Sequence, residues 1–484
     1  MGELPLGLSF DDVLLVPQKS EVLPAGVDIS THLTADIPLR IPIVSSAMDT
    51  VTEDGLAIAL AREGGIGVIH RNMPIADQVN MVAKVKRSEN MVIDDPFTIA
   101  PNITLEALQS IMDERGVNGF PVVDDSGTLV GMVTSRDIWY VEDSQASVSN
   151  VMTSREDLVT APEATSMEDA RRILYQNRIE KLPLIDGEGK LAGLITAQDI
   201  EKRQQFTNAA KDPNGRLRVG AGIGVGDDCY ERAEGVIGAG ADAVFIDAAT
   251  GHTKRVMDVV EKLAGEGKVP VVAGNVVTEQ GAKDLISAGA SAVKVGVGPG
   301  SICTTRVIAG VGTPQFSAIQ NVADVCREAG VAVIADGGIR YSGDIVKAMA
   351  AGADMVMLGS LLAGCKESPG EMVNYQGRTW KEYRGMGSLK AMRKGSGDRY
   401  GQNSSGKLVA EGVEARVPYR GPLNDTVFQL LGGLRSGMGY VGANDLGELR
   451  DRATFVRITP GGLKESHAHD ITITEEPVNY QSTS

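Results

Sequence analysis

Short apolar segments rich in β-branched residues recur along most of the chain, and each ends in a small or polar residue. They lie, in order, at 41–49, 66–70, 217–222, 243–247, 269–275, 292–296, 331–336 and 353–359. Amphipathic stretches with helical spacing separate most of them, as at 256–264, 280–288 and 343–350. Nearly continuous hydrophobic strands that alternate with helices predict an α/β fold whose parallel sheet is buried on both faces. Eight such units predict a closed (β/α)8 TIM barrel.

An open, doubly wound sheet is the alternative arrangement of alternating strands and helices. That fold would favour a G-x-G-x-x-G turn after its first strand, followed by an acidic residue that binds a ribose. No such pattern stands at a first turn of this chain. We therefore expect the barrel.

A second pattern is an internal repeat with an offset of 62 residues, in which 119–137 returns as 181–199. Each copy predicts a strand, a turn with Asp and Gly, a second strand and the start of a helix. An amphipathic helix precedes each copy, at 105–115 and 166–177. Two copies predict a pseudo-symmetric pair rather than a solenoid. We expect this pair, residues 92–150 and 151–204, to be a separate domain inserted into a catalytic barrel formed by residues 1–91 and 205–484.

Charge and composition narrow the class of partner. The net charge is -16, which gives no basic footprint for nucleic acid or an anionic membrane. The inserted segment 92–204 holds 20 acidic and 10 basic residues and so accounts for -10 of this charge. The chain has no apolar run near the ~18 residues of a membrane span, and its amino terminus lacks the pattern of a signal peptide. These features predict a cytoplasmic protein that binds small molecules.

Glycine-rich segments follow the seventh and eighth predicted strands, at 336–339 and 358–361. The loops after barrel strands meet at one face, and this pair of strands commonly supplies a phosphate site. Exposed backbone N–H groups and the Ser360 hydroxyl would donate to the phosphate, while Asp336 would accept from ribose hydroxyls. Tight turns without a ligand are the alternative interpretation.

The four cysteines are too few and too scattered for a disulfide framework or a zinc site. Cys303 lies in the glycine-dense loop 296–306, where converging N–H dipoles would stabilise a thiolate nucleophile. The segments around Cys229, Cys326 and Cys365 lack such a glycine-dense loop, and we expect these three cysteines to serve packing.

Both the inserted pair and the whole chain resemble known families. The pair resembles a tandem CBS module, a regulatory unit that binds adenine nucleotides. The chain as a whole resembles the inosine-5'-monophosphate (IMP) dehydrogenase family. The motifs that carry this second resemblance are Gly298–Arg306, Asp336–Arg340, Tyr383–Gly387, Asp398–Tyr400 and Glu411–Gly412, together with the inserted pair.

The family resemblance implies an NAD-dependent oxidoreductase that converts IMP to XMP, the committed step of guanine nucleotide synthesis. Cys303 would add to C2 of the purine and, after hydride transfer, form a covalent thioimidate. A mobile flap at about 388–410 would then direct hydrolysis through Arg399, acting as general base, and Tyr400, with Thr305 and Glu411 assisting. Residue chemistry alone favours Arg399 as an anion clamp, because an arginine pKa exceeds ~12. Gly401 follows this pair where the family more often carries a bulky residue.

The resemblance also implies ligand contacts. IMP would contact Ser301, Asp336, Gly337, Gly338, Gly359, Ser360, Tyr383, Arg384, Gly385, Met386, Gly387 and Glu411. NAD would contact Asp247, Gly296, Val297 and Gly298. A potassium ion would be held by Gly298, Gly300 and Cys303 together with the partner subunit's Glu465, Ser466 and His467, in a homotetramer or an octamer. ATP or GTP at the CBS pair would face Thr134, Asp137, Thr196 and Asp199.

Other interpretations are open for two of these ligand sets. Each Thr-x-x-Asp of the CBS pair also fits a cap of the following helix. His467 and His469 also fit a transition-metal site. We expect His32, His70 and His252 to be structural.

Two other functions are compatible with parts of this pattern. GMP reductase shares the barrel and the cysteine loop but lacks the Arg-Tyr flap and normally the CBS pair. A nucleotide-sensing regulator would use the CBS pair and would have lost catalysis in the barrel. The presence of Cys303, Thr305 and Arg399 favours the dehydrogenase over both.

Overall fold

The computed structural model describes residues 4–88, 92–93, 96–141, 143–198, 200, 206–402, 406–474, 477 and 479–480. The chain divides into two compact units, one of Met1–Ser88 with Asn208–Ser484 and one of Glu89–Thr207. Within the described ranges, no helix combines the length and apolar character needed to cross a bilayer.

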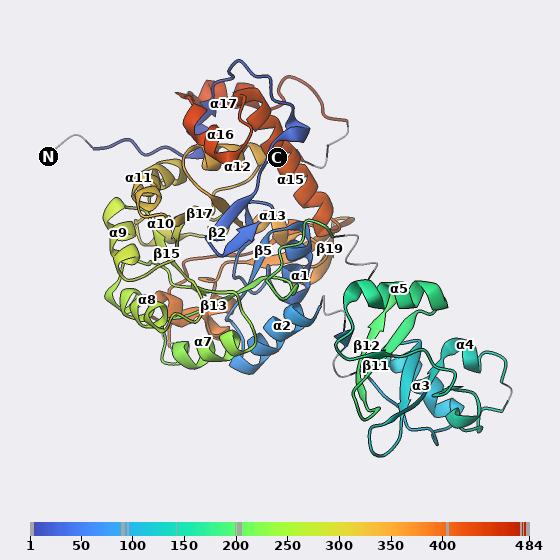
Figure 1. Ribbon diagram of the computed structural model, residues 1–484. Helices are drawn as coiled ribbons and strands as arrows, with labels where there is room; N and C mark the ends of the chain where they lie inside the picture. The colour runs from blue at the N-terminus through green and yellow to red at the C-terminus, as the bar shows by residue number, and fades with distance from the viewer. Residues whose placement is uncertain are drawn as a thin grey trace. The chain divides into compact units, whose positions relative to one another are not determined.

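Eight parallel strands close into a barrel in the larger unit (Figure 1). These strands are β4 (Ile43–Ser45), β5 (Ile66–Ile69), β13 (Val219–Ile223), β14 (Ala243–Ile246), β15 (Val271–Val276), β16 (Ala292–Val295), β17 (Ala332–Asp336) and β18 (Met355–Leu358). Each matches one of the predicted apolar segments. Pairing of β5 with β13 and of β18 with β4 closes the ring, which confirms the TIM barrel and excludes the open sheet.

Helices surround the barrel and cover the outer faces of its strands. They are α1 (Asp54–Glu63), α2 (Ile75–Arg87), α7 (Cys229–Gly238), α8 (Lys254–Glu266), α9 (Glu279–Ser287), α11 (Gln315–Glu328), α12 (Ser342–Ala350) and α15 (Leu423–Val441). The last of these, α15, packs against α12 and α1 and so takes the eighth place in the ring. It lies far along the chain from β18, because the segments that build the site intervene.

The intervening segments leave from the carboxyl end of β18. They comprise α13 (Ser360–Ala363) and the antiparallel sheet of β19 (Met372–Tyr375), β20 (Arg378–Arg384) and β21 (Glu414–Pro418). They also include α14 (Leu389–Lys394) and η4 (Ser396–Tyr400), which lie in the segment predicted to be a flap and called the flap below. A short helix, α10 (Thr305–Ile308), follows the cysteine loop.

The two ends of the chain add small elements. They are η1 (Phe10–Asp12), β1 (Val13–Leu15), η2 (Pro24–Gly26), β2 (Thr31–Thr34), β3 (Ile37–Leu39), α16 (Leu446–Arg452), β22 (Phe455–Arg457) and α17 (Pro460–Ser466). Of these, the β2–β3 hairpin packs into the barrel core.

The barrel interior is packed with side chains. Phe245, Val68, Ile334 and Met355 are buried inside it together with residues of the β2–β3 hairpin. Gly220 makes room for the phenyl ring, since a Cβ there would lie 2.5 Å from Phe245 Cε2. Because the interior is filled, ligands can enter only at the loops beyond the strand ends.

Contacts within the barrel unit fix the two segments that flank the inserted unit, one near residue 86 and one near residue 210. Lys86, near the end of α2, extends its buried Nζ to Asp212 Oδ2 at 3.0 Å and to Asp242 Oδ2 at 2.8 Å. The Ala210 N–H donates to the Ala61 carbonyl at 2.8 Å. The chain therefore leaves and re-enters the barrel at positions that are fixed to each other.

The smaller unit contains two copies of one motif. Its elements are β6 (Val92–Ile93), α3 (Leu105–Arg115), β7 (Gly119–Val123), β8 (Leu129–Thr134), α4 (Ser135–Ile138), η3 (Val148–Asn150), β9 (Thr153–Ser154), β10 (Ala161–Pro162), α5 (Met167–Asn177), β11 (Lys181–Ile185) and β12 (Leu191–Thr196). The helix and both strands of the first copy recur in the second with the 62-residue offset seen in the sequence. The copies join symmetrically, since Leu129 N donates to Gly189 O and Leu191 N donates to Gly127 O, each at 3.3 Å.

Candidate active site

Two adjoining cavities lie at the carboxyl ends of the barrel strands and share Ser46, Met48, Gly300, Asp336 and Gly337. The first is also lined by predicted catalytic and NAD-contacting residues: Asp247, Gly296, Val297, Gly298, Cys303, Thr305, Arg399, Tyr400 and Glu411, with Gly385, Met386 and Gly387. The second is also lined by predicted IMP-contacting residues: Ser301, Gly338, Gly359, Ser360 and Tyr383. We name them the reaction cavity and the phosphate cavity.

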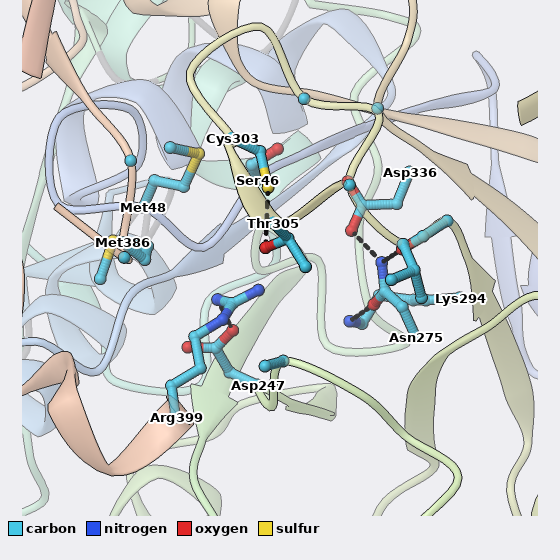
Figure 2. A pocket seen from close by; sticks show the side chains of 18 of the residues that line it. Ser46, Met48, Asp247, Asn275, Lys294, Cys303, Thr305, Asp336, Met386 and Arg399 are labelled. Atoms are coloured by element: carbon cyan, nitrogen blue, oxygen red, sulfur yellow. Dashed lines mark hydrogen bonds and ion pairs between the residues drawn. The ribbon is translucent and has the colours of Figure 1, made fainter. Parts of the chain in front are cut away.

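Cys303 begins a series of two hydrogen bonds in the reaction cavity, and Figure 2 shows the first of them, to Thr305. Its Sγ lies 3.3 Å from Thr305 Oγ1, which in turn donates to Glu411 Oε2 at 2.8 Å. The Thr304 N–H donates to the Glu411 carbonyl at 3.0 Å, which holds the Glu411 segment against the cysteine loop. This series connects the sulfur to a carboxylate through one hydroxyl, an arrangement suited to moving a proton.

The other three cysteines are buried. Burial raises the pKa of Cys326 to about 12 and that of Cys365 to about 11. Burial, followed by the charge of Asp228, also raises the pKa of Cys229. Cys303 is the partly exposed member of the four, so it is the one suited to nucleophilic chemistry.

The phosphate cavity is built on backbone that glycine favours. Gly337 has φ +91° and Gly338 has φ +81°, and a Cβ on Gly337 would lie 2.9 Å from Pro299 Cγ. Burial raises the pKa of Tyr383 to about 12, so its phenol stays neutral. This hydroxyl would lie 3.1 Å from a Cβ placed on Gly359.

Asp336 is oriented by two residues that the sequence analysis did not single out. Asn275 Nδ2 donates to Asp336 Oδ2 at 2.9 Å and to the Gly296 carbonyl at 2.8 Å. Lys294 Nζ donates to Asn275 Oδ1 at 2.6 Å (Figure 2). Burial lowers the pKa of Lys294, although the charges of Asp336 and Asp247 oppose that shift. Both residues lie in predicted strand segments, 269–275 and 292–296. A polar residue in an otherwise apolar strand was the sequence signal that could have identified them.

The flap reaches into the reaction cavity. The Arg399 guanidinium forms an ion pair with the Asp247 carboxylate beyond the end of β14 (Figure 2). Burial alone would lower the pKa of Arg399, but the negative charge of Asp247 outweighs it and raises the pKa above its usual value. Burial would raise the pKa of Asp247, yet the charges of Arg399 and Arg71 hold it below its usual value. In this arrangement Arg399 is a cation.

Gly401 ends η4 in a left-handed conformation with φ +65°, and a Cβ there would meet nothing within 4 Å. Glycine at this position therefore allows the backbone to turn directly after Tyr400. The Tyr400 ring packs against Gly387, since a Cβ placed on Gly387 would lie 2.8 Å from the phenolic oxygen.

Arg384, predicted to contact IMP, is directed elsewhere and lines neither cavity. Its guanidinium binds the buried Asp49 carboxylate, with Nη2 at 2.6 Å from Oδ2, and also lies 3.4 Å from Glu382. Asn72 Nδ2 donates to the same Asp49 carboxylate at 2.8 Å. Because side chains alternate along β20, Tyr383 points into the cavity and Arg384 points away from it. Its role is to anchor the 383–387 loop.

The predicted potassium ligands fall into two groups. Gly298 and Gly300 line the reaction cavity with Cys303, whereas Glu465 and Ser466 end α17. His467 packs against Tyr341 and Tyr480. None of these three carboxyl-terminal residues lines either cavity within the chain. Among the described residues, no cluster of three or more His, Cys, Asp or Glu could hold a transition metal.

Several of the remaining predicted residues have local partners. His70 hydrogen-bonds Glu53 at 3.3 Å and His252 hydrogen-bonds Asp284 at 2.7 Å. In the smaller unit, Asp137 Oδ2 accepts from the Thr134 N–H at 2.6 Å and from its hydroxyl at 2.8 Å, which caps α4. Thr196 ends β12, and Asp199 lies outside the described residues.

Comparison with known proteins identifies the family. Residues 7–469 match the model of the IMP dehydrogenase / GMP reductase domain. The chain is 57% identical to inosine-5'-monophosphate dehydrogenase of Aquifex aeolicus over 478 residues, 98% of this chain and 97% of the relative. It is 52% identical to the enzyme of the same name from Bacillus subtilis over 98% of both chains.

A GMP reductase variant from Trypanosoma brucei, solved with guanosine 5'-monophosphate, superposes with a TM-score of 0.90 at 40% identity. That match covers 97% of this chain and 99% of the other. Coverage this complete includes the inserted segment, so the insertion does not separate the two activities as the sequence analysis expected. The matched family model and these near full-length relatives show that the chain belongs to the IMP dehydrogenase / GMP reductase family.

Proposed function

We propose that the chain catalyses the NAD-dependent oxidation of IMP to XMP, with Cys303 as nucleophile and the flap as the hydrolytic element. The observation that carries this proposal is the convergence of Cys303, Thr305, Glu411, Arg399 and Tyr400 on one cavity. Relatives at 52–57% identity are named for this activity. A reductase would have no need of the Arg-Tyr pair beside the cysteine, because it hydrolyses no covalent adduct.

IMP would bind across both cavities. The backbone of Gly337, Gly338 and Gly359 with the hydroxyls of Ser301, Ser360 and Tyr383 would hold the phosphate, since all line the phosphate cavity. Asp336, on the wall common to both cavities, would accept from the ribose hydroxyls, and Asn275 fixes its orientation. Gly385, Met386, Gly387 and Glu411 would then border the purine.

The redox step begins with the Cys303 thiol losing its proton, for which the Thr305–Glu411 series supplies a path. The thiolate forms a bond to C2 of the purine, and the C2 hydrogen leaves with its electron pair. NAD, when bound, supplies the hydride acceptor, and Asp247, Gly296, Val297 and Gly298 line the cavity where it would lie. The purine remains attached to sulfur as a thioimidate.

Hydrolysis adds water to C2 and breaks the C–S bond, which restores the thiolate and releases XMP and a proton. Arg399 would have to lose its proton to act as the base, yet Asp247 favours its charged form. We infer that Arg399 first separates from Asp247, and that Glu411 accepts the proton through Thr305 whenever Arg399 stays charged. Arg399 of the flap is ion-paired with Asp247, the residue at which NAD would bind. The flap and NAD would therefore use Asp247 one after the other, with NAD leaving before the flap closes.

A potassium ion fits the oxygen-only donor set of the cysteine loop. The carbonyls of Gly298, Gly300 and Cys303 would hold it, completed by the partner subunit's Glu465, Ser466 and His467. Gly298 has φ +76°, and a Cβ there would lie 2.6 Å from Arg306 Cγ, so only glycine leaves this turn in place. The ion would fix the loop that carries Cys303. Such a site requires a homo-oligomer, which we propose to be a tetramer or an octamer.

The inserted unit would act as a regulatory domain for ATP or GTP at Thr134, Asp137, Thr196 and Asp199. Its acidic charge would require Arg136, Arg155 or Mg²⁺ to compensate the phosphates. If activity and oligomer size do not respond to either nucleotide, this part of the proposal is wrong.

The deciding experiment supplies the purified protein with IMP and NAD and follows NADH absorbance and XMP by chromatography. We expect both products in equal amounts and neither from Cys303→Ala. No NADH, combined with consumption of NADPH in the presence of GMP, would assign the chain to the reductase instead.

A further inference from the structure

Arg71 links the fixed barrel to the flap. It follows β5 by two positions, and its side chain is 7% exposed. Its Nη1 and Nη2 lie 3.0 Å from the two carboxylate oxygens of Asp398, in the forked geometry that arginine forms with carboxylates. Its Nε lies 3.3 Å from Asp247 Oδ2. One guanidinium therefore binds an acid of the barrel and an acid of the flap.

The barrel reserves space for this contact at the end of β13. A Cβ on Gly224 would lie 2.9 Å from Arg71 Cζ, so the guanidinium lies directly against glycine backbone. A Cβ on Gly226 would lie 3.3 Å from Asp398 Oδ2. Glycine backbone of the barrel therefore borders both charged groups of the contact.

Four charges alternate across the contact, in the order Asp398, Arg71, Asp247 and Arg399. Arg71 and Asp247 belong to the barrel, and the sequence neighbours Asp398 and Arg399 belong to the flap. The two charges of each pair cancel, so barrel and flap each contribute no net charge to the contact. Departure of the flap would leave Arg71 paired with Asp247, so neither side keeps an isolated charge in the cavity. Closing would therefore add two ion pairs, Arg71–Asp398 and Arg399–Asp247, without adding net charge.

We propose that Arg71 is the positioning residue of the flap: it binds Asp398 and thereby sets Arg399 and Tyr400 against the Cys303 adduct for hydrolysis. The same residue keeps Asp247 oriented when the flap withdraws. Arg71 touches no reacting atom in this scheme and acts through its two acidic partners. The inference rests on the proposed function, because only a two-step reaction needs a flap that closes after hydride transfer.

Asp398→Asn tests the contact with little risk to folding, since the Asp398 side chain is 35% exposed. With IMP and NAD we expect the rapid NADH burst to keep its rate and amplitude within about twofold, while steady-state turnover falls about tenfold or more. Backbone amides of 389–402 should exchange with deuterium faster in the free enzyme. Asp398→Glu should recover part of the turnover, and Arg71→Lys, which loses the fork, should act in the same direction as Asp398→Asn.

The matched control is Asp258→Asn, which removes the exposed Lys254–Asp258 pair on α8 and should change none of these measurements. Equal loss of burst and turnover in Asp398→Asn, unchanged or faster turnover, or unchanged amide exchange would overturn the proposal. If the unmodified protein forms no NADH, the proposed function fails, and the exchange of 389–402 alone then decides whether Arg71 holds the flap.

Discussion

The guanidinium of Arg399 forms an ion pair with the carboxylate of Asp247, although 152 positions separate the two residues in the chain. Asp247 is also the residue at which NAD is expected. Under the proposed function, one acidic side chain would serve the flap in one half of the reaction and the dinucleotide in the other, which would order the two steps.

Arg399→Ala should separate these steps. Cys303, Thr305 and Glu411 remain in place, so one NADH per active site should form rapidly. Hydrolysis should then slow by about 10²-fold or more, the scale of a lost acid–base group. A stopped-flow NADH burst and intact-protein mass spectrometry of the trapped purine adduct measure both effects. A variant that loses its burst as completely as its turnover would contradict this division.

Cys303 should be the cysteine that alkylating agents modify. Burial raises the pKa of Cys326 to about 12 and of Cys365 to about 11, so neither forms thiolate near neutral pH. Peptide mapping after brief treatment with iodoacetamide should find the label on the peptide with Cys303, and IMP should slow its incorporation. Labelling of Cys326 or Cys365 at a similar rate would show that exposure does not control reactivity here.

Gly337→Ala should impair IMP binding. The substitution places a Cβ 2.9 Å from Pro299 Cγ at φ +91°, a conformation that costs an L-residue about 1–2 kcal/mol. We expect the KM for IMP to rise about tenfold, with the KM for NAD much less affected. Gly343→Ala on α12 is the matched control, because its Cβ would meet nothing within 4 Å. A similar change in both variants would argue against a phosphate site at Gly337.

Asp49→Asn should destabilise the barrel unit. Asp49 and Arg384 have side chains 1% and 6% exposed, and removal of one partner from such a pair costs about 3–5 kcal/mol. Urea unfolding at neutral pH measures this loss. Asp324→Asn, which breaks the exposed Asp324–Arg327 pair, should cost less than about 1 kcal/mol.

The same Asp49 substitution should alter the response to acid. Burial would raise the pKa of Asp49, but hydrogen bonding and charge from Arg384 lower it below its unfolded value of about 3.9. Its stabilisation is thus complete above that unfolded pKa and is lost as the pH falls through the lower folded pKa. The stability difference between the two proteins should stay constant from neutral pH to about pH 5 and shrink below about pH 4. A difference that shrinks already near neutral pH would contradict the assigned direction.

The eight barrel strands were predictable because each is buried on both faces and therefore apolar along its whole length. The place of α15 was not, since the sheet β19–β21 and the flap separate it from β18, and only packing against α12 and α1 puts it in the ring. The repeat was predictable from its constant offset, because identical offsets preserve the strand pairing of each copy.

In the site, too, residues with a local sequence pattern were predictable and residues that depend on distant partners were not. Cys303 and the glycine-rich ends carry recognisable local patterns, whereas the role of Arg71 depends on Asp398, which is 327 positions away. Arg384 was grouped with the IMP contacts because it adjoins Tyr383 in sequence, whereas the strand alternation that turns its side chain toward Asp49 follows from the pairing of β20 with β21. Contacts between distant segments are fixed by tertiary packing, which a local motif does not encode.

The ion pair between Lys86 and Asp212 has an evolutionary consequence. It ties the departing and returning ends of the barrel chain across the 119 residues of the smaller unit, 89–207. A gene that shortened or exchanged that stretch would leave the ends of the barrel where they are, as in other proteins that tolerate domain insertion. Selection can therefore exchange the smaller unit without remaking the barrel that carries Cys303.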